Sequence, residues 1–227
     1  MKKFAILMIA LVVALASVNA QATVLMGPDV NNGSFESPAI VPGEGVGGSG
    51  TFWYQFTTPT GWTFWDGYLG GNPAIQTIGT TGDGSVTVVA PPENGSQFST
   101  ICAGGGYLYQ SGTCGNFQAD TIYTLTGYGS RVGASTPELF LGNGNDGVIV
   151  ALPQTTNFVF TAFPTITIDT SVETGLVGRP IEVVCRSIIN PSGTDALFDN
   201  IVLTAAAVPE PASLILLCLG GLFLRKK

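Results

Sequence analysis

The sequence predicts an all-β protein, an antiparallel β-sandwich, held between two apolar ends. Glycine and threonine abound and proline is scattered, with 31 Gly and 14 Pro in 227 residues. Between the ends no long stretch shows the spacing of an amphipathic helix, and short alternating or β-branched runs recur instead. Many short strands separated by turn residues are typical of two stacked antiparallel sheets.

Turn segments such as GTTGDG, GNGNDG and NPSGTD separate the predicted strands. For GNGNDG, at residues 142–147, a hairpin turn is favoured over a cation-binding loop. No fixed-period repeat and no linker divides the chain before residue 205, so residues 21–204 are predicted to form one domain. The predicted strands lie at residues 51–56, 85–90, 107–110, 121–127, 147–152, 157–163, 166–169, 181–188 and 196–204.

Residues 1–20 have the layout of a secretory signal peptide. Two lysines precede an apolar run at residues 4–16, and small residues before position 21 offer a cleavage site. A cut after Ala22 is the alternative. A permanent N-terminal anchor is disfavoured because the apolar run is short for a membrane span.

The chain ends VPEPASLILLCLGGLFLRKK. A helix over the apolar run at residues 212–224 covers roughly 20 Å, against about 30 Å of hydrocarbon in a bilayer. Pro209 and Pro211 interrupt any extension of that helix, because proline removes a backbone donor. The three terminal basic residues hold the tail in the cytoplasm. The segment is therefore a marginal span suited to being cut, and a plain C-terminal anchor is the alternative.

This ending resembles the PEP-CTERM sorting signal of Gram-negative bacteria, with a Pro-Glu-Pro motif, an apolar helix and a basic end. The resemblance covers the sorting segment at residues 205–227. It implies processing by an exosortase, a membrane transpeptidase, after transient contact with the inner membrane. The protein would then be released or transferred to the cell surface or extracellular matrix. The residues that carry the motif are Pro209, Glu210, Pro211, Arg225, Lys226 and Lys227.

Charge and composition exclude several classes of function. Between the two ends only Arg131, Arg179 and Arg186 oppose fourteen acidic residues, so this region carries a net charge of −11. Such a surface repels nucleic acid. The chain has no histidine, which removes the usual general base and the commonest metal ligand. The composition still allows a site for a hard cation with oxygen ligands.

The domain begins NNGSFESP, at residues 31–38, and closes LFDNIVLT, at residues 197–204. These motifs resemble the first and last strands of galactose-binding-like jelly rolls, the fold of many carbohydrate-binding modules. The resemblance spans most of residues 30–204 and implies a jelly-roll sandwich.

First and last strands of a jelly roll are neighbours, so Glu36 and Asp199 are expected to approach each other at one edge. In the related modules a structural calcium often occupies this corner. The resemblance therefore implies Glu36 as a calcium ligand, and Asp199 as a ligand or a support for one, with backbone carbonyls completing the shell. The alternative is that both are solvated residues at strand ends.

Eight aromatic residues, all three tryptophans among them, crowd into one short segment of the chain. Aromatic faces stack on the C–H faces of sugar rings, while neighbouring polar groups bond the hydroxyls. Trp62 corresponds to a core position in the galactose-binding-like jelly rolls that the sequence resembles. The candidates for an exposed carbohydrate-binding platform are Trp53, Trp65, Asp66 and Tyr68. The alternative is that all eight aromatic residues serve the core.

The chain has four cysteines. Cys102 and Cys114 have a spacing that allows a disulfide between neighbouring strands in an oxidising compartment, and pairing and free thiols stay equally open. Cys185, in the apolar run IEVVCRSII, is predicted to be a buried thiol. Cys218 lies in the sorting segment.

Together these patterns predict a non-catalytic exported surface or matrix protein that binds carbohydrate, such as an exopolysaccharide. A purely structural or adhesive component of a biofilm or envelope is the second hypothesis. A glycoside-cleaving enzyme is the third, and it requires two carboxylates about 5–10 Å apart. No motif selects such a pair among Asp66, Glu93, Glu138 and Asp146.

Overall fold

The structure, a computed structural model, describes residues 21–40, 47–49, 52–65, 72–77, 97–102, 106–152, 156–188 and 194–208. In these residues it is antiparallel β-structure with one short 3-10 helix, η1 (Thr174–Leu176). The predicted jelly-roll sandwich is confirmed. The predicted signal peptide, the predicted strand at residues 85–90 and the Pro-Glu-Pro motif lie outside the described residues. In the described part of the chain, no helix combines the length and the apolar character that a membrane span requires.

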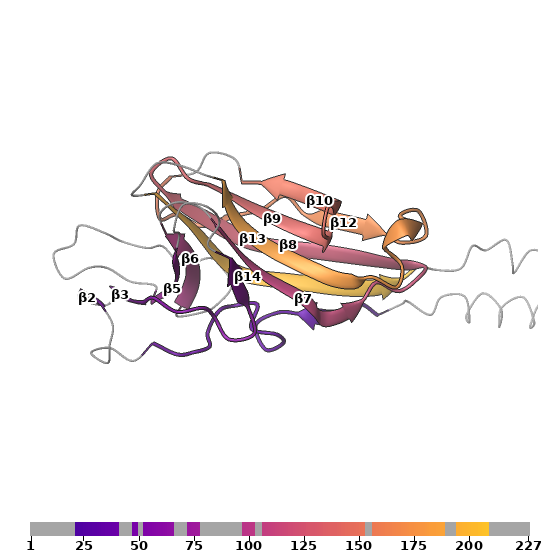
Figure 1. The fold of residues 1–227 in the computed structure, drawn as a ribbon, viewed down its shortest axis with the longest axis horizontal. Coiled ribbons are helices and arrows are strands. Elements are labelled where there is room, and N and C mark those ends of the chain that lie inside the picture. Colours follow the sequence, from indigo (N-terminus) through magenta and orange to yellow (C-terminus); the bar gives the residue numbers. More distant parts are fainter. Residues whose placement is uncertain are drawn as a thin grey trace, which may run out of the picture.

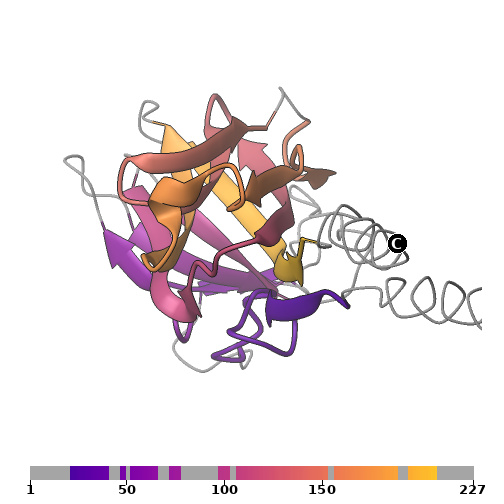
Figure 2. The same ribbon diagram turned by 90° about the vertical axis from the view of Figure 1, so that its right-hand side faces the viewer.

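Two sheets pack face to face, with their long strands running along the molecule (Figures 1 and 2). Among the described residues one sheet has nine strands: β1 (Thr23–Met26), β2 (Gly47–Ser49), β3 (Phe52–Gln55), β5 (Asn72–Thr77), β6 (Gln97–Cys102), β8 (Thr121–Val132), β11 (Thr161–Ala162), β12 (Ile166–Asp169) and β14 (Asp195–Ala207). The other has five: β4 (Thr63–Trp65), β7 (Gly106–Asn116), β9 (Thr136–Asn143), β10 (Asp146–Ala151) and β13 (Pro180–Ile188).

The order of the nine-stranded sheet is β11-β8-β14-β6-β5-β3-β2, with β1 paired to β14 and β12 paired to β8. The order of the five-stranded sheet is β10-β9-β13-β7-β4. Strands that neighbour each other in sequence, such as β3 and β4, therefore often belong to different sheets. The chain crosses repeatedly between the two layers, although β2 and β3, β5 and β6, and β9 and β10 are neighbours in both sequence and space.

The core lies between the inner faces of the two sheets. Alternate side chains of a strand point to opposite faces, and in β8 Tyr123 and Leu125 point inward. Val183 and Cys185 of β13 face them from the other sheet. The predicted buried thiol is confirmed, because Cys185 is fully buried and burial raises its pKa above the usual range.

Two glycines of β8 are required by close packing. A Cβ atom at Gly127 would lie 2.5 Å from Cδ1 of Ile201, and one at Gly129 would lie 2.7 Å from the ring of Phe163. Both distances are shorter than any carbon contact that packing tolerates. Glycine at these positions lets the buried side chains of Ile201 and Phe163 lie directly against the sheet.

A β-bulge in β14 changes which residues face the core. Between Asp199 and Val202 the register shifts, so three steps along β14 face two steps along β8. Inside the bulge Asn200 adopts a φ of 47°, in the left-handed region. As a result Phe198 and Ile201 both belong to the core although they are three positions apart.

Most of the predicted strands are confirmed, and the predicted hairpin at residues 142–147 joins β9 to β10 through the pair Asn143 and Asp146. The predicted strand at residues 157–163 is wrong in length, since within it only β11 is a strand. β1, β2, β4, β5, β6 and β9 were not predicted. In β6, Gln97 and Ser99 interrupt the apolar residues of the core face. Both are buried, and their side chains donate to backbone carbonyls, Gln97 Nε2 to Phe35 at 3.2 Å.

The two ends of the domain meet at one sheet edge, as the indigo β1 and the yellow end of β14 show in Figure 2. Thr23 pairs with Ala205. Beyond β14 the backbone N–H of Val208 donates to the carbonyl of Asp120 at 2.8 Å. The Pro-Glu-Pro motif therefore follows the folded sheet directly, with no linker between them.

Candidate functional site

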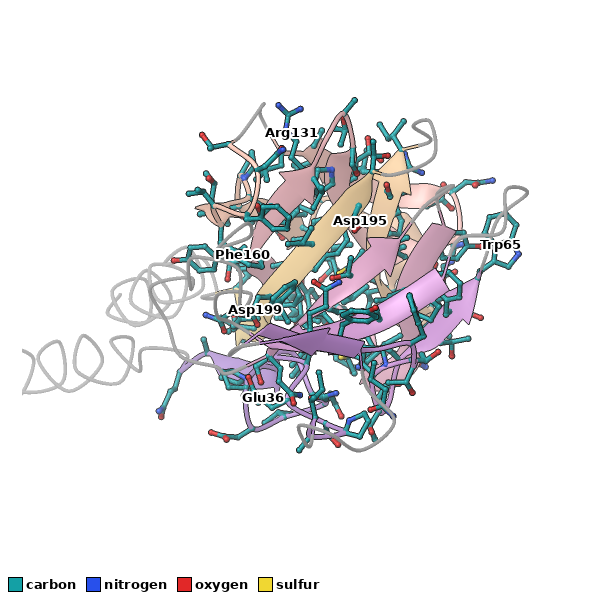
Figure 3. The ribbon with its side chains drawn as sticks, turned by 90° about the vertical axis from the view of Figure 1, so that its left-hand side faces the viewer. Glu36, Trp65, Arg131, Phe160, Asp195 and Asp199 are labelled. Carbon is teal, nitrogen blue, oxygen red and sulfur yellow. The ribbon has the colours of Figure 1, made fainter. Side chains whose placement is uncertain are left out.

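The first candidate site is an acidic corner formed by Glu36 and Asp199, which Figure 3 labels beside each other. Glu36 follows a segment fixed to β14, since the N–H of Ile201 donates to the carbonyl of Gly33 at 2.8 Å. Glu36 Oε1 accepts the N–H of Gln97 at 3.0 Å. The predicted approach of these two carboxylates is thus present in the structure.

Asp199 has no exposed surface. Its Oδ1 accepts the N–H of Asn200 at 2.7 Å, whereas its Oδ2 has no hydrogen-bond partner among the described residues. Burial, with a smaller contribution from the charge of Glu36, raises the pKa of Asp199 to about 8, and the Asn200 hydrogen bond opposes this shift. A buried carboxylate of this kind takes up a proton or a cation.

The chemistry of the corner fits a hard cation. In the described part of the chain no third Asp, Glu, Cys or His joins the two carboxylates. Backbone carbonyls and water would therefore complete the shell of a bound calcium ion. The alternative prediction, a solvated strand-end residue, is wrong for Asp199, which is fully buried.

The second candidate site is the outer face of the five-stranded sheet. Strand register aligns its outward side chains in rows that cross all five strands, while the alternate residues of the same strands, such as Leu108 and Val183, lie in the core. One row, which we call the Trp65 row, consists of Trp65, Tyr107, Arg186, Glu138 and Ala151. The next row consists of Thr63, Tyr109, Val184, Phe140 and Ile149.

Three aromatic rings form a continuous surface at the β4 side of this face. Trp65 and Tyr107 stack with ring centroids 4.9 Å apart and planes 24° apart, and the rings of Tyr107 and Tyr109 lie 5.7 Å apart. Trp65 is 40% exposed, and both tyrosines are half-buried. Burial, with the nearby groups of Tyr109 and Glu182, raises the pKa of Tyr107. Its hydroxyl therefore stays protonated at neutral pH and is available as a hydrogen-bond donor.

An ion pair continues the Trp65 row beyond the aromatic rings. Arg186 lies directly across from Tyr107 on one side and from Glu138 on the other. Its Nε donates to Glu138 Oε2. The side chain of Glu138 is 9% exposed and that of Arg186 is 46% exposed. The row thus combines an apolar ring surface with guanidinium donors that reach solvent.

The predicted aromatic platform is only partly assembled. Trp65 lies on the outer face, but Trp53 belongs to β3 of the other sheet, so the two tryptophans share no sheet. Asp66 and Tyr68 lie outside the described residues. Trp62 is buried as expected, and its ring lies 5.0 Å from that of Phe35.

Sequence reasoning missed Tyr107, Tyr109 and Arg186. The alternation in GYLYQ already places both tyrosines on one face of a strand. No sequence signal shows that this face meets Trp65 and Arg186, because that depends on the register of β4 and β13 with β7.

The predicted disulfide between Cys102 and Cys114 is not formed, and Cys114 is a free thiol. Cys102 of β6 pairs with Asp195 of β14, and Asp195 pairs on its other side with Val132 of β8. Cys114 instead contacts the carbonyl of Leu25 at 3.5 Å.

Leu25 lies in β1 between the pairs Val24–Thr204 and Met26–Leu203, and Leu203 faces Leu125 of β8. The seven steps from residue 125 to residue 132 place the two cysteines roughly 20 Å apart along the sheet. A disulfide requires Cα atoms within about 7 Å. Burial raises the pKa of the Cys114 thiol to about 11, against an opposing hydrogen bond from Asn31.

Comparison with known proteins identifies the C-terminal segment. Residues 207–227 match the family model described as the PEP-CTERM protein-sorting motif. A search of curated proteins finds no match.

A cyclase from Fischerella sp. TAU has a similar structure, with a TM-score of 0.61 and 18% identity over 82% of this chain and 98% of the cyclase. At this identity the likeness shows a shared fold. The CBM22-1 xylan-binding domain of Paenibacillus barcinonensis Xyn10C gives a TM-score of 0.43 and 12% identity over 82% of this chain and 96% of the domain. TmCBM61 in complex with β-1,4-galactotriose gives 0.42 and 12% over 64% and 89%.

The raised pKa of Asp199 predicts a pH-dependent stability when divalent cations are chelated. Between its ordinary value of 3.8 and about 8, the folded protein binds more protons at Asp199 than the unfolded chain does. The free energy of unfolding therefore falls as the pH rises through this window. Urea unfolding in EDTA from pH 4.5 to 8.5 should show the fall, and Asp199→Asn should flatten it. The exposed-site control Asp146→Asn should keep the wild-type slope, and an equal slope in Asp199→Asn contradicts the prediction.

Proposed function

We propose that this protein is a non-catalytic, exosortase-processed surface or extracellular-matrix protein of a Gram-negative bacterium that binds polysaccharide on the outer face of its five-stranded sheet. The PEP-CTERM motif at residues 207–227 indicates an exported protein sorted by an exosortase. The observation that carries the binding proposal is the partly exposed stack of Trp65 on Tyr107, continued by Tyr109.

The chemistry of the Trp65 row suits a pyranose ring. The C–H face of a sugar packs on an aromatic ring, and the rings of Trp65 and Tyr107 offer a rigid surface with little side-chain entropy to lose. The guanidinium of Arg186 and the hydroxyl of Tyr107 lie next along the row and donate hydrogen bonds to sugar hydroxyls. Successive rows along the face provide room for more than one sugar of a chain.

We further propose that the acidic corner holds a structural calcium ion. Glu36 and the buried, unbonded Oδ2 of Asp199 would be its side-chain ligands. A bound cation would stabilise ionised Asp199 and so fix the bulge of β14. It would take no part in contacting the polysaccharide, because Figure 3 places Trp65 on the other side of the molecule from the corner.

A structural or adhesive role without a defined ligand is the alternative. A glycoside-cleaving enzyme is less well supported. Glu138 and Asp146 lie on one hairpin, five strand positions apart, which corresponds to about 17 Å. Paired glycosidase carboxylates lie about 5–10 Å apart. Asp66 and Glu93 lie outside the described residues.

Substitution of Trp65 tests polysaccharide binding. In gels that contain a polysaccharide bound by the wild type, Trp65→Ala should lower the affinity for that polysaccharide by about tenfold or more, because it removes the exposed half of the ring stack. Phe56→Ala is the matched control, since Phe56 is also an exposed aromatic residue, at 65%, but lies off the five-stranded sheet. Equal retention of both variants, or no retention of the wild type across a broad glycan panel, would favour the structural alternative.

Calcium should raise the melting temperature of the wild-type protein at pH 8 after prior chelation. Saturation at about a hundred times the dissociation constant adds about 2.7 kcal/mol, or about 5–10 °C for a domain of this size. Asp199→Asn should lose most of this rise, and Asp146→Asn should retain it. A wild-type melting temperature that calcium leaves unchanged contradicts the proposed ion.

Processing by an exosortase predicts a shortened secreted protein. Mass spectrometry of the exported chain should find a C-terminus near Pro209 or Pro211 and no Arg225-Lys226-Lys227 peptide. In a strain lacking the exosortase, the same peptide should remain in the membrane fraction. The intact C-terminal peptide in membranes of the unmodified strain would instead indicate a lasting anchor.

A further inference from the structure

We infer that Glu138 restricts the polysaccharide site to uncharged glycans by neutralising Arg186. This inference rests on the proposed function of the same face and names the class of glycan it accepts. Arg186 is the cation of the Trp65 row, directly beside Tyr107, so it meets any sugar that stacks on the rings. Whether it attracts an anion depends on the carboxylate paired to it.

The pair is built so that Glu138 stays with Arg186. Glu138 is the neighbour of Arg186 across the β9–β13 register, and its Oε2 accepts from the guanidinium Nε. Its side chain is 9% exposed, whereas that of Arg186 is 46% exposed. Glu138 therefore compensates the charge of Arg186 from the less exposed side of the pair, and the remaining guanidinium N–H groups face solvent as hydrogen-bond donors.

The other charged residues that the structure describes on this face add no attraction for an anion. Glu182 lies two rows away from the Trp65 row, opposite Ser111 and Gly142, and among the described residues of this face Glu138 and Glu182 outnumber Arg186. Arg179 forms an ion pair with Asp146. The region between the terminal segments carries a net charge of −11. A polyuronate or sulfated glycan approaching the Trp65 row is therefore repelled at long range and meets a neutralised cation on contact.

An uncharged glycan has neither disadvantage. Its hydroxyls accept from Arg186 and Tyr107, and its C–H face packs on Trp65 without any change in ionisation. The ion pair then acts as a fixed polar group, because Glu138 already holds the guanidinium in one orientation. Binding should accordingly depend weakly on ionic strength.

The test uses the secreted, processed protein in affinity gels and titrations with uncharged polymers, xylan and β-1,4-galactan, and charged ones, polygalacturonate and alginate. The wild type should bind at least one uncharged polymer and should bind both charged ones much more weakly. Glu138→Gln should gain about fivefold in affinity for the charged polymers, since it frees the Arg186 charge, and the gain should vanish at high salt. A solely structural role of Glu138 predicts loss of binding and no such gain.

Glu182→Gln is the matched control. It changes the net charge of the same face by the same amount but leaves the Arg186–Glu138 pair intact, so it should gain clearly less than Glu138→Gln. An equal gain in both variants, or wild-type binding to charged polymers as tight as to uncharged ones, overturns the inference and leaves the binding function standing. Failure of the wild type to bind any glycan overturns the proposed function itself. The wild-type panel decides between these outcomes even if Glu138→Gln fails to fold.

Discussion

The register of β14 is the constraint on which the rest of the structure depends. This strand pairs with β1, β6 and β8 and runs along the sandwich (Figure 1). Its bulge keeps both Phe198 and Ile201 in the core and leaves Asp199 buried with one oxygen unbonded. A buried carboxylate is costly unless a proton or a cation compensates it. The stability of the central strand is therefore tied to whatever binds at the acidic corner.

The same strand also places the processing site. Because β14 ends beside the start of β1, Thr23 and Ala205 lie at one edge of the domain, close in the sequence to the predicted signal peptide and to the sorting segment. Val208 is still hydrogen-bonded to Asp120, so the cleavable motif begins where the sheet ends. Processing at the sorting motif would therefore act at this edge of the domain, whereas the Trp65 row lies on the outer face of the five-stranded sheet.

The two candidate sites rest on different physics and lie apart in the molecule (Figure 3). The corner owes its character to burial, which raises the pKa of Asp199 and makes it responsive to protons and cations. The Trp65 row owes its character to exposure, because Trp65 and Arg186 act only if a ligand reaches them. A rigid sandwich serves both, since it fixes the rings and the ion pair before a ligand arrives.

The sequence alone predicted the sorting segment, the all-β class and the longest strands of both sheets, because those follow from motif, composition and periodicity. The approach of Glu36 to Asp199 followed from the resemblance to galactose-binding-like jelly rolls. The sequence did not predict β6, because buried Gln97 and Ser99 interrupt the apolar residues of that strand. It also did not predict the distance between Cys102 and Cys114. Only the tertiary structure separated Trp53 from Trp65 and joined Trp65 to Tyr107 and Arg186. Periodicity along a strand tells which residues share a face. Which faces meet is decided by register between strands, and bulges and chain crossings set that register far from the residues concerned.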